Sequence, residues 1–317
     1  MEPLQSVVVL VANSNGGWFA THDGVDAGGL RVAEEVIHAV ATQPNLKKLS
    51  VIGSCLWLLA CSLLIGLVSS GHSLGGLYAR YAIGVLYEKK ILPDKLEPVN
   101  FVTLASPHLG SRQHTKVFSK PVAAAGARLL GSTGFQLMLE DGGVPLLVRM
   151  ATEDPFLAAL RSFKMLKLYA NVCGDFSVHF CSAAILSANP FKSGSLVQEQ
   201  PQQDAVVLKR ARLETDEGEH VEEGTEIKQA LPEVGLIVSP AGREEGELKH
   251  DTLFSHEAPH MRERLVQMLT SLNELNWRKS FVFGRPFLAH TDIVVKRTWA
   301  NAAGIPVVSD LIKGLSF

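Results

Sequence analysis

The sequence predicts an α/β fold with a mostly parallel sheet covered by helices on both faces. Two observations support this prediction. Short apolar runs typical of buried strands alternate along the chain with longer segments of helical periodicity. A glycine-flanked serine also stands between an apolar run and a helical segment, which is a strand, turn and helix arrangement. At 317 residues the chain is long enough for one such domain with a well-buried core.

The first elements are expected to be a strand and a helix. The β-branched residues of VVVLV, at 7–11, precede the turn residues Asn-Ser-Asn-Gly-Gly and predict a buried strand. Apolar residues then recur at helical spacing in LRVAEEVIHAVATQ, at 30–43, with Glu34 and Glu35 between them. This pattern predicts an amphipathic helix packed on a sheet.

The stretch VIGSCLWLLACSLLIGLVSSGHSLGG, at 51–76, allows two interpretations. Eighteen residues from Val51 to Val68 carry no charge and would reach about 27 Å as a helix, the lower limit for a membrane span. A helix ending at Val68 would, however, consume the strand expected to lead into Ser73. We therefore predict that Leu64–Ser69 forms the buried strand before the serine and that the segment preceding it is displaced as helix or loop.

Further elements follow at shorter intervals. The segment after Ser73 is expected to be a helix, and three apolar runs, VNFVTLAS, MLKLYANVCGD and KSFVF, predict strands. Two helices are expected at MRERLVQMLTSL and PVVSDLIKGL. The segment 192–249, between MLKLYANVCGD and MRERLVQMLTSL, is rich in Glu, Gln and Gly and too poor in apolar residues to form a core. We therefore expect the first part of an α/β core at 1–191, a flexible polar excursion at 192–250 and the rest of the core at 251–317.

Composition excludes some partners. Thirty basic and thirty-two acidic residues leave a formal charge of −2, so no overall positive field would attract nucleic acid. The four cysteines lack the paired spacing of a zinc site, and neither a metal nor another cofactor is expected. The amino terminus lacks the basic region of a secretory signal, and we expect a cytoplasmic protein. Oligomeric state cannot be predicted.

The motif Gly71-His72-Ser73-Leu74-Gly75 fits the G-x-S-x-G pattern of a nucleophile elbow. In such an elbow, glycines two residues on either side let strand and helix approach closely while the serine adopts a strained backbone. A neutral serine hydroxyl is a weak nucleophile and needs a histidine base, which in turn needs a carboxylate to orient it. Ser73 is the predicted nucleophile.

The acid and the base are expected downstream of Ser73, in that order. Asp175 follows a predicted strand and a glycine, where a loop can present a carboxylate at the carboxyl edge of the sheet. A plain turn aspartate is the alternative. His290 lies in a loop after the last predicted strand, whereas His250, His256 and His260 are not delivered by any strand. We therefore predict Asp175 and His290 as the acid and the base.

With these residues in view, the chain resembles the lipase-like serine esterases of the α/β-hydrolase superfamily found in plants and fungi. The resemblance rests on five segments that sample most of the chain outside the polar excursion: DGVDAGGLRVAEEV, GHSLGGLYARYAIGVLY, LEPVNFVTLASPHLGSR, LYANVCGDFSV and FLAHTDIVVKRTW. It implies hydrolysis of a lipid or small carboxylic ester, with association at a membrane or lipid surface. It also implies Ser73 as nucleophile, His290 as base and, less securely, Asp175 as acid.

Two departures from the family suggest an alternative function. Family members carry an earlier strand ending in His-Gly that donates one oxyanion N–H, and this sequence has no such segment, which leaves the backbone N–H of Leu74 as donor. Losing one donor costs about a hundred- to thousand-fold in rate. In the family, VIG would also run directly into HSLGG, whereas here residues 54–71 intervene as an insert. The alternative is therefore a catalytically impaired relative, either a binding protein or a non-functional isoform.

Overall fold

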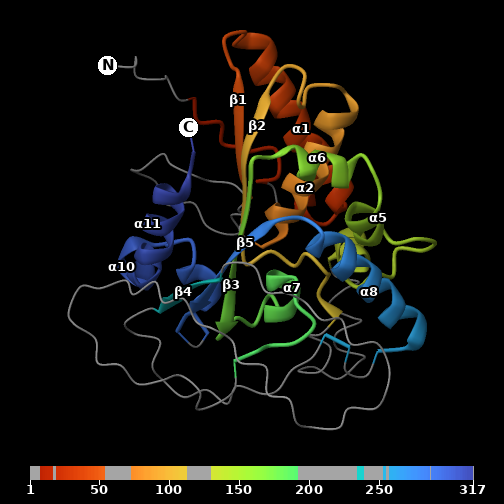
Figure 1. Ribbon diagram of the computed structural model, residues 1–317, viewed down its shortest axis with the longest axis vertical. Helices are drawn as coiled ribbons and strands as arrows, with labels where there is room; N and C mark the ends of the chain where they lie inside the picture. The colour runs from red at the N-terminus through yellow and green to blue at the C-terminus, as the bar shows by residue number, and fades with distance from the viewer. Residues whose placement is uncertain are drawn as a thin grey trace.

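The computed structural model describes residues 8–16, 19–53, 73–112, 130–191, 234–238, 253–254, 257–285 and 287–316. Within these ranges it contains a five-stranded sheet in the order β1-β2-β3-β5-β4 (Figure 1). The strands are β1 (Lys48–Gly53), β2 (Glu97–Leu104), β3 (Met165–Cys173), β4 (Val234–Val238) and β5 (Trp277–Phe283). All four pairings are parallel, so the carboxyl ends of the strands meet at one edge of the sheet.

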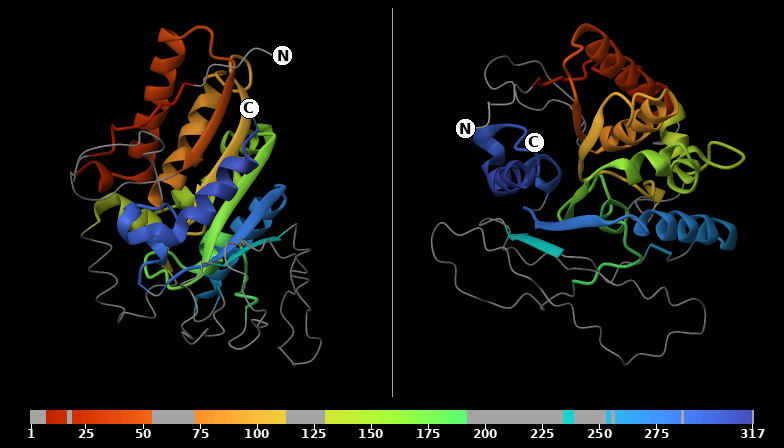
Figure 2. Two further views of the ribbon diagram at one scale, coloured as in Figure 1. Left: turned by 90° about the vertical axis from the view of Figure 1, so that its left-hand side faces the viewer. Right: turned by 45° about the horizontal axis from the view of Figure 1, so that its top comes forward.

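Helices cover both faces of the sheet, as the two further views make clear (Figure 2). One face carries the larger helices α1 (Val25–Thr42), α2 (Leu74–Glu88) and α8 (Pro259–Asn273), with the shorter α4 (Gly131–Leu137), α5 (Leu146–Thr152), α6 (Phe156–Ser162) and α7 (Phe180–Ala184). The other face carries α10 (Thr298–Asn301) and α11 (Ile305–Gly314), which follow α9 (Ala289–Asp292). Two short 3-10 turns, η1 (Phe19–Thr21) and η3 (Ala302–Gly304), join these elements.

Two hydrophobic cores result, one on each face. Successive residues of β2 point to opposite sides, so Phe101 lies in the larger core while Val102 and Leu104 lie in the smaller one beneath α11. Val307 and Leu311 of α11 complete the smaller core. Strands buried on both faces read as continuous apolar runs, which is why β2, β3 and β5 were predictable. The predicted α/β fold is confirmed.

The predicted strand at 7–11 is wrong. Val8, Val9 and Leu10 are 45%, 52% and 44% exposed and belong to no strand, while Val7 lies outside the described residues. The segment instead runs beside α1. The Glu35 carboxylate on α1 accepts hydrogen bonds from the backbone N–H groups of Asn13, at 3.2 Å, and Ser14, at 2.8 Å. β-Branched composition favours a strand only where a neighbouring strand edge is available to pair with it.

The strand beside β2 is Lys48–Gly53, not the predicted Leu64–Ser69, which lies outside the described residues. The connection after α1 explains the choice, because only residues 43–47 separate the end of α1 from β1. A strand at residue 64 would need a connection of about twenty residues, far longer than is usual between a helix and a strand. Val51–Gly53 belong to this strand, so a membrane-spanning helix beginning at Val51 is also wrong. No helix in the described part of the chain is long and apolar enough to cross a bilayer.

Strand β4 was not anticipated either. β4 lies within the polar stretch 192–250 and pairs in parallel with β5, so that Leu236 is opposite Phe281. The other residues of this stretch lie outside the described ranges. The domain boundaries at 191 and 250 therefore remain a prediction.

Candidate active site

The three predicted catalytic residues lie at the carboxyl ends of three adjacent strands, β2, β3 and β5. The backbone N–H of Ser73 donates to the carbonyl of Leu104, the last residue of β2, at 3.2 Å. Asp175 comes two residues after β3, and His290 lies in α9, after β5. Because β2, β3 and β5 are adjacent and parallel, their carboxyl ends place all three residues at the same edge.

Ser73 has the strained backbone expected of a nucleophile elbow. Its φ is 67° and its ψ is −110°, a conformation that residues with a side chain rarely adopt. It immediately precedes α2, and the next residue, Leu74, is the first of that helix. The first N–H groups of a helix have no partner within the helix, and they point toward the serine end. The turn therefore presents both a hydroxyl and backbone donors at the sheet edge.

A glycine allows α2 to approach the end of β2. A Cβ on Gly76 would lie 1.9 Å from Oγ and 2.6 Å from Cβ of Ser106, which follows β2. No side chain fits in that space, so only glycine permits the observed position of α2. The close contact at Gly76 thus sets how near Ser73, at the start of α2, lies to the loop after β2.

Asp175 is held by four hydrogen bonds. Gly174, with a φ of 73°, turns the chain immediately after β3. One carboxylate oxygen of Asp175 accepts the backbone N–H groups of Ser177 and Val178, each at 2.9 Å. The other accepts the Asn171 amide at 2.9 Å and lies 2.8 Å from Nδ1 of His290. The carboxylate is thereby fixed against the imidazole.

The environment of Asp175 determines its charge and the tautomer of His290. The Asp175 side chain is only 2% exposed, and burial alone would raise its pKa. The hydrogen bonds from His290 and Asn171 and from the backbone outweigh burial and lower the pKa of Asp175 below its ordinary value. An ionised carboxylate can only accept, so Nδ1 of His290 carries the proton, and Nε2 is the nitrogen able to take a proton from a hydroxyl.

An arginine–aspartate pair closes the loop that carries His290. Nε and Nη2 of Arg285 donate to the two carboxylate oxygens of Asp292, at 2.8 and 2.7 Å. Asp292 is 3% exposed and also accepts the Asn301 amide at 2.7 Å, while Arg285 reaches the carbonyl of Ala300 at 2.5 Å. These contacts tie the start and end of the loop together on either side of His290, so its ring is presented from a braced segment.

A second set of buried polar residues braces the loop after β2. Arg80 of α2 donates to the carbonyl of His108 at 3.1 Å and to that of Met150 at 3.0 Å. The imidazole of His108 lies 2.9 Å from the hydroxyl of Thr103. Burial, with the nearby charges of Arg80 and Lys279, lowers the pKa of His108 well below its ordinary value, so this histidine is neutral and structural. The SPHLG and LYARYAIG segments are thus in contact through Arg80.

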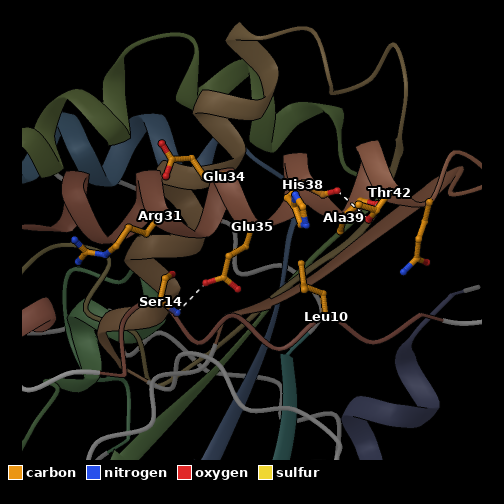
Figure 3. A pocket seen from close by; sticks show the side chains of 9 residues that line it. Leu10, Ser14, Arg31, Glu34, Glu35, His38, Ala39 and Thr42 are labelled. Carbon is orange, nitrogen blue, oxygen red and sulfur yellow. Dashed lines mark hydrogen bonds between the residues drawn. The ribbon is translucent and has the colours of Figure 1, made fainter.

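A hollow of about 490 Å³ lies elsewhere, on the outer side of α1 (Figure 3). Its lining is part of α1 and of the segment that precedes it: Leu10, Ser14, Arg31, Glu34, Glu35, His38, Ala39, Thr42 and Gln43. In this view Glu35 points to the backbone of Ser14, to which it is hydrogen-bonded. Neither Asp175 nor His290 borders the hollow, so it is separate from the candidate site.

Some site residues escaped sequence analysis. Asn171 was visible as a single amide in the apolar strand MLKLYANVC, four residues before Asp175. Arg285 and Asp292 flank His290, but nothing in the sequence indicated that they pair. Among the competing histidines, His260 is exposed on α8, and His250 and His256 lie outside the described residues. No group of three or more metal-ligating side chains is found in the part of the chain that the structure describes.

Comparison with known proteins gives a consistent result. A family model described as "Putative serine esterase (DUF676)" matches residues 2–188. The chain is 26% identical over 381 residues to the "Putative lipase ROG1" of Saccharomyces cerevisiae, an alignment that covers 96% of this chain and 51% of the yeast protein. It is 39% identical over 121 residues to the "Putative lipase YDL109C" of the same yeast, covering 37% of this chain and 18% of that protein.

A third relative is the "Putative lipase C4A8.10" of Schizosaccharomyces pombe, which is 29% identical over 191 residues, or 56% of this chain and 22% of that protein. The chain therefore spans about half the length, or less, of these relatives. No solved structure matches the chain significantly.

Proposed function

The chain belongs to the family described as "Putative serine esterase (DUF676)", and from that premise we propose that it cleaves carboxylic esters through an acyl-enzyme on Ser73. The observation that carries the proposal is the 2.8 Å contact between Asp175 and His290 at the sheet edge where Ser73 immediately precedes α2. A strained serine at the end of β2, a carboxylate after β3 and an imidazole after β5 are the groups that acyl transfer requires.

In the proposed reaction, Nε2 of His290 accepts the hydroxyl proton as the oxygen of Ser73 attacks the ester carbonyl. The imidazolium that forms is stabilised by the Asp175 carboxylate, which stays ionised because its pKa is lowered. His290 then gives the proton to the leaving alkoxide, so that an alcohol departs and Ser73 is acylated. Water, deprotonated by His290, attacks the acyl-enzyme; the bond to the Ser73 oxygen breaks, His290 returns the proton to that oxygen, and the carboxylic acid is released.

The negative charge that develops on the carbonyl oxygen also needs donors. The backbone N–H of Leu74, at the first position of α2, is the proposed donor from this chain's described residues. The positive end of the helix dipole of α2 would support the same charge.

We further propose lipid acyl esters as the substrate class. Three relatives carry the name "Putative lipase", which supports an ester with a long apolar acyl group over a charged or sugar-based ester. The proposed substrate would meet the enzyme at a lipid surface.

The experiment that tests this function is turnover of a p-nitrophenyl ester series of increasing acyl length by the full chain. Ser73→Ala and His290→Ala should each abolish turnover, whereas His260→Ala, an exposed histidine on α8, should leave it unchanged. Absence of turnover with every ester, by a chain that is folded, would favour the catalytically impaired alternative. A chain lacking residues 54–71 should be assayed in parallel, to measure what that insert contributes.

A further inference from the structure

Two exposed phenylalanine rings lie on the loops that carry the acid and the base. Phe176 directly follows Asp175, and Phe287 lies three residues before His290. The rings stack, with centroids 4.7 Å apart and planes inclined by 16°. Phe176 is 56% exposed, Phe287 78% and the adjacent Leu288 41%. We call Phe176, Phe287 and Leu288 the aromatic platform.

The backbone at Phe287 argues that the platform does not exist for stability. Phe287 has a φ of 62°, a left-handed conformation that is rare and unfavourable for a bulky residue. Glycine would adopt it without strain. A ring that is 78% exposed gains little burial to offset the strain. A strained, exposed aromatic residue beside a candidate active site points instead to a functional contact.

The size of the platform favours a lipid surface over a protein partner. With about 200 Å² for a whole phenylalanine, the two rings expose roughly 270 Å² together. A stable protein interface needs about 800 Å² from each partner, together with a complementary shape. A lipid surface requires no matching shape, and a few inserted apolar side chains are enough to bind it.

Two charged groups beside the platform are already engaged within the protein. Arg285 is paired with Asp292, and the Asp175 carboxylate accepts four hydrogen bonds, one of them from His290. The contact should therefore be apolar and depend little on salt or on anionic lipid. This distinguishes it from a basic patch that binds acidic membranes.

We propose that the aromatic platform inserts into the surface of a lipid aggregate and holds the carboxyl edge of the sheet against it. This deepens, and rests on, the proposed ester hydrolase function, because it presents Ser73 and His290 to esters that lie within the aggregate. The substrate class is then a water-insoluble ester embedded in a neutral lipid surface.

The test is sedimentation of the full chain with phosphatidylcholine vesicles, in a Ser73→Ala background so that no lipid is consumed. Phe176→Ser and Phe287→Gly should each weaken vesicle binding by about tenfold, as expected when roughly 60 Å² of apolar surface, about half of what either ring exposes, no longer leaves water. The matched control is Val144→Ser, which removes a side chain of similar exposure, 57%, from the turn before α5. It should bind vesicles as the parent does.

Phe287→Gly gives a second, opposite readout. It removes the unfavourable φ, so its thermal unfolding midpoint should equal or exceed that of the parent while its vesicle binding falls. Unchanged binding of both phenylalanine variants, equal loss in Val144→Ser, or a lowered midpoint for Phe287→Gly would overturn the proposal. So would self-association of the parent that both phenylalanine variants abolish, because the platform would then bind a second copy.

Vesicle binding and catalysis fail separately in this design. If the Ser73→Ala parent binds vesicles through the platform but the chain with Ser73 intact does not hydrolyse a short soluble ester, the proposed hydrolase function is refuted and the proposal of lipid-surface binding is retained. If the soluble ester is hydrolysed but vesicle binding is independent of Phe176 and Phe287, only the surface proposal fails.

Discussion

Substitution of Gly76 by alanine tests how α2 positions the proposed nucleophile. Judged by helix propensity alone, a glycine to alanine change within a helix should stabilise the protein by up to about 1 kcal/mol. The structure predicts the opposite sign. The new Cβ would lie 2.6 Å from Cβ of Ser106, and ordinary contact begins near 3.4 Å, so α2 and the loop after β2 must separate by 0.8 Å.

A displacement of this size should affect both stability and rate. Overpacking of a buried contact costs about 1–3 kcal/mol in the free energy of unfolding. Moving a catalytic group by about 1 Å can cost roughly a hundredfold in rate, so kcat/KM for p-nitrophenyl butyrate should fall by about that factor. Urea unfolding and steady-state kinetics measure the two effects on the same preparation.

The companion change Ser106→Gly supplies the control. It removes both clashing atoms and leaves Cγ2 of Thr103, at 3.2 Å, as the nearest neighbour of the new Cβ. The double variant should therefore recover at least tenfold in kcat/KM over Gly76→Ala alone. The reasoning is refuted if Gly76→Ala is as active as the parent and more stable, because α2 would then not be positioned by this contact.

Three further predictions concern the acid, the loop of the base and the buried lysine. Asp175→Asn keeps the shape of the side chain but favours the wrong tautomer of the His290 imidazole, so kcat for a p-nitrophenyl ester should fall by roughly 10⁴-fold. A loss of less than tenfold would exclude Asp175 as the acid. Arg285→Lys replaces the bidentate hydrogen bonding to Asp292 by a single hydrogen bond and should lower kcat by about tenfold with little change in KM. A loss of stability with unchanged kcat would show that the pair is purely structural. Burial lowers the pKa of Lys279, which is 2% exposed, to about 7 from 10.5, so between these values the unfolded chain binds one more proton and stability rises with pH. From pH 7.5 to 9.5 the stability of the parent relative to Lys279→Met, measured by urea unfolding, should rise by roughly 2 kcal/mol or slightly more, and a flat difference would contradict a buried titrating lysine.

The sequence predicted those parts of the fold in which local pattern and final environment agree. β2, β3 and β5 are buried on both faces, so their apolar runs were sufficient evidence, and α1 has one apolar side because it packs on one face. Apolar composition gave wrong predictions where the pairing between strands determines which segment joins the sheet. The segment 7–11 has strand composition but no strand to pair with, and β1 was passed over because a more apolar run stands closer to Ser73.

The candidate site could be predicted as far as chain order and strand ends allow. Asp175 and His290 were chosen because each follows a strand, and parallel pairing brings such positions to one edge. The supporting contacts were not predictable in the same way. Asn171 reaches Asp175 because of the turn at Gly174, and Arg285 meets Asp292 because a loop folds back on itself. Both depend on tertiary geometry that no periodicity encodes.

The central claim, that Ser73 is an activated nucleophile, is tested most directly by covalent labelling of the folded full chain with a fluorophosphonate probe, followed by intact mass measurement and peptide mapping. We expect one adduct per chain, located on Ser73, with labelling that is slowed by His290→Ala and absent after heat denaturation. An unlabelled folded chain, or an adduct on a different serine, would contradict it.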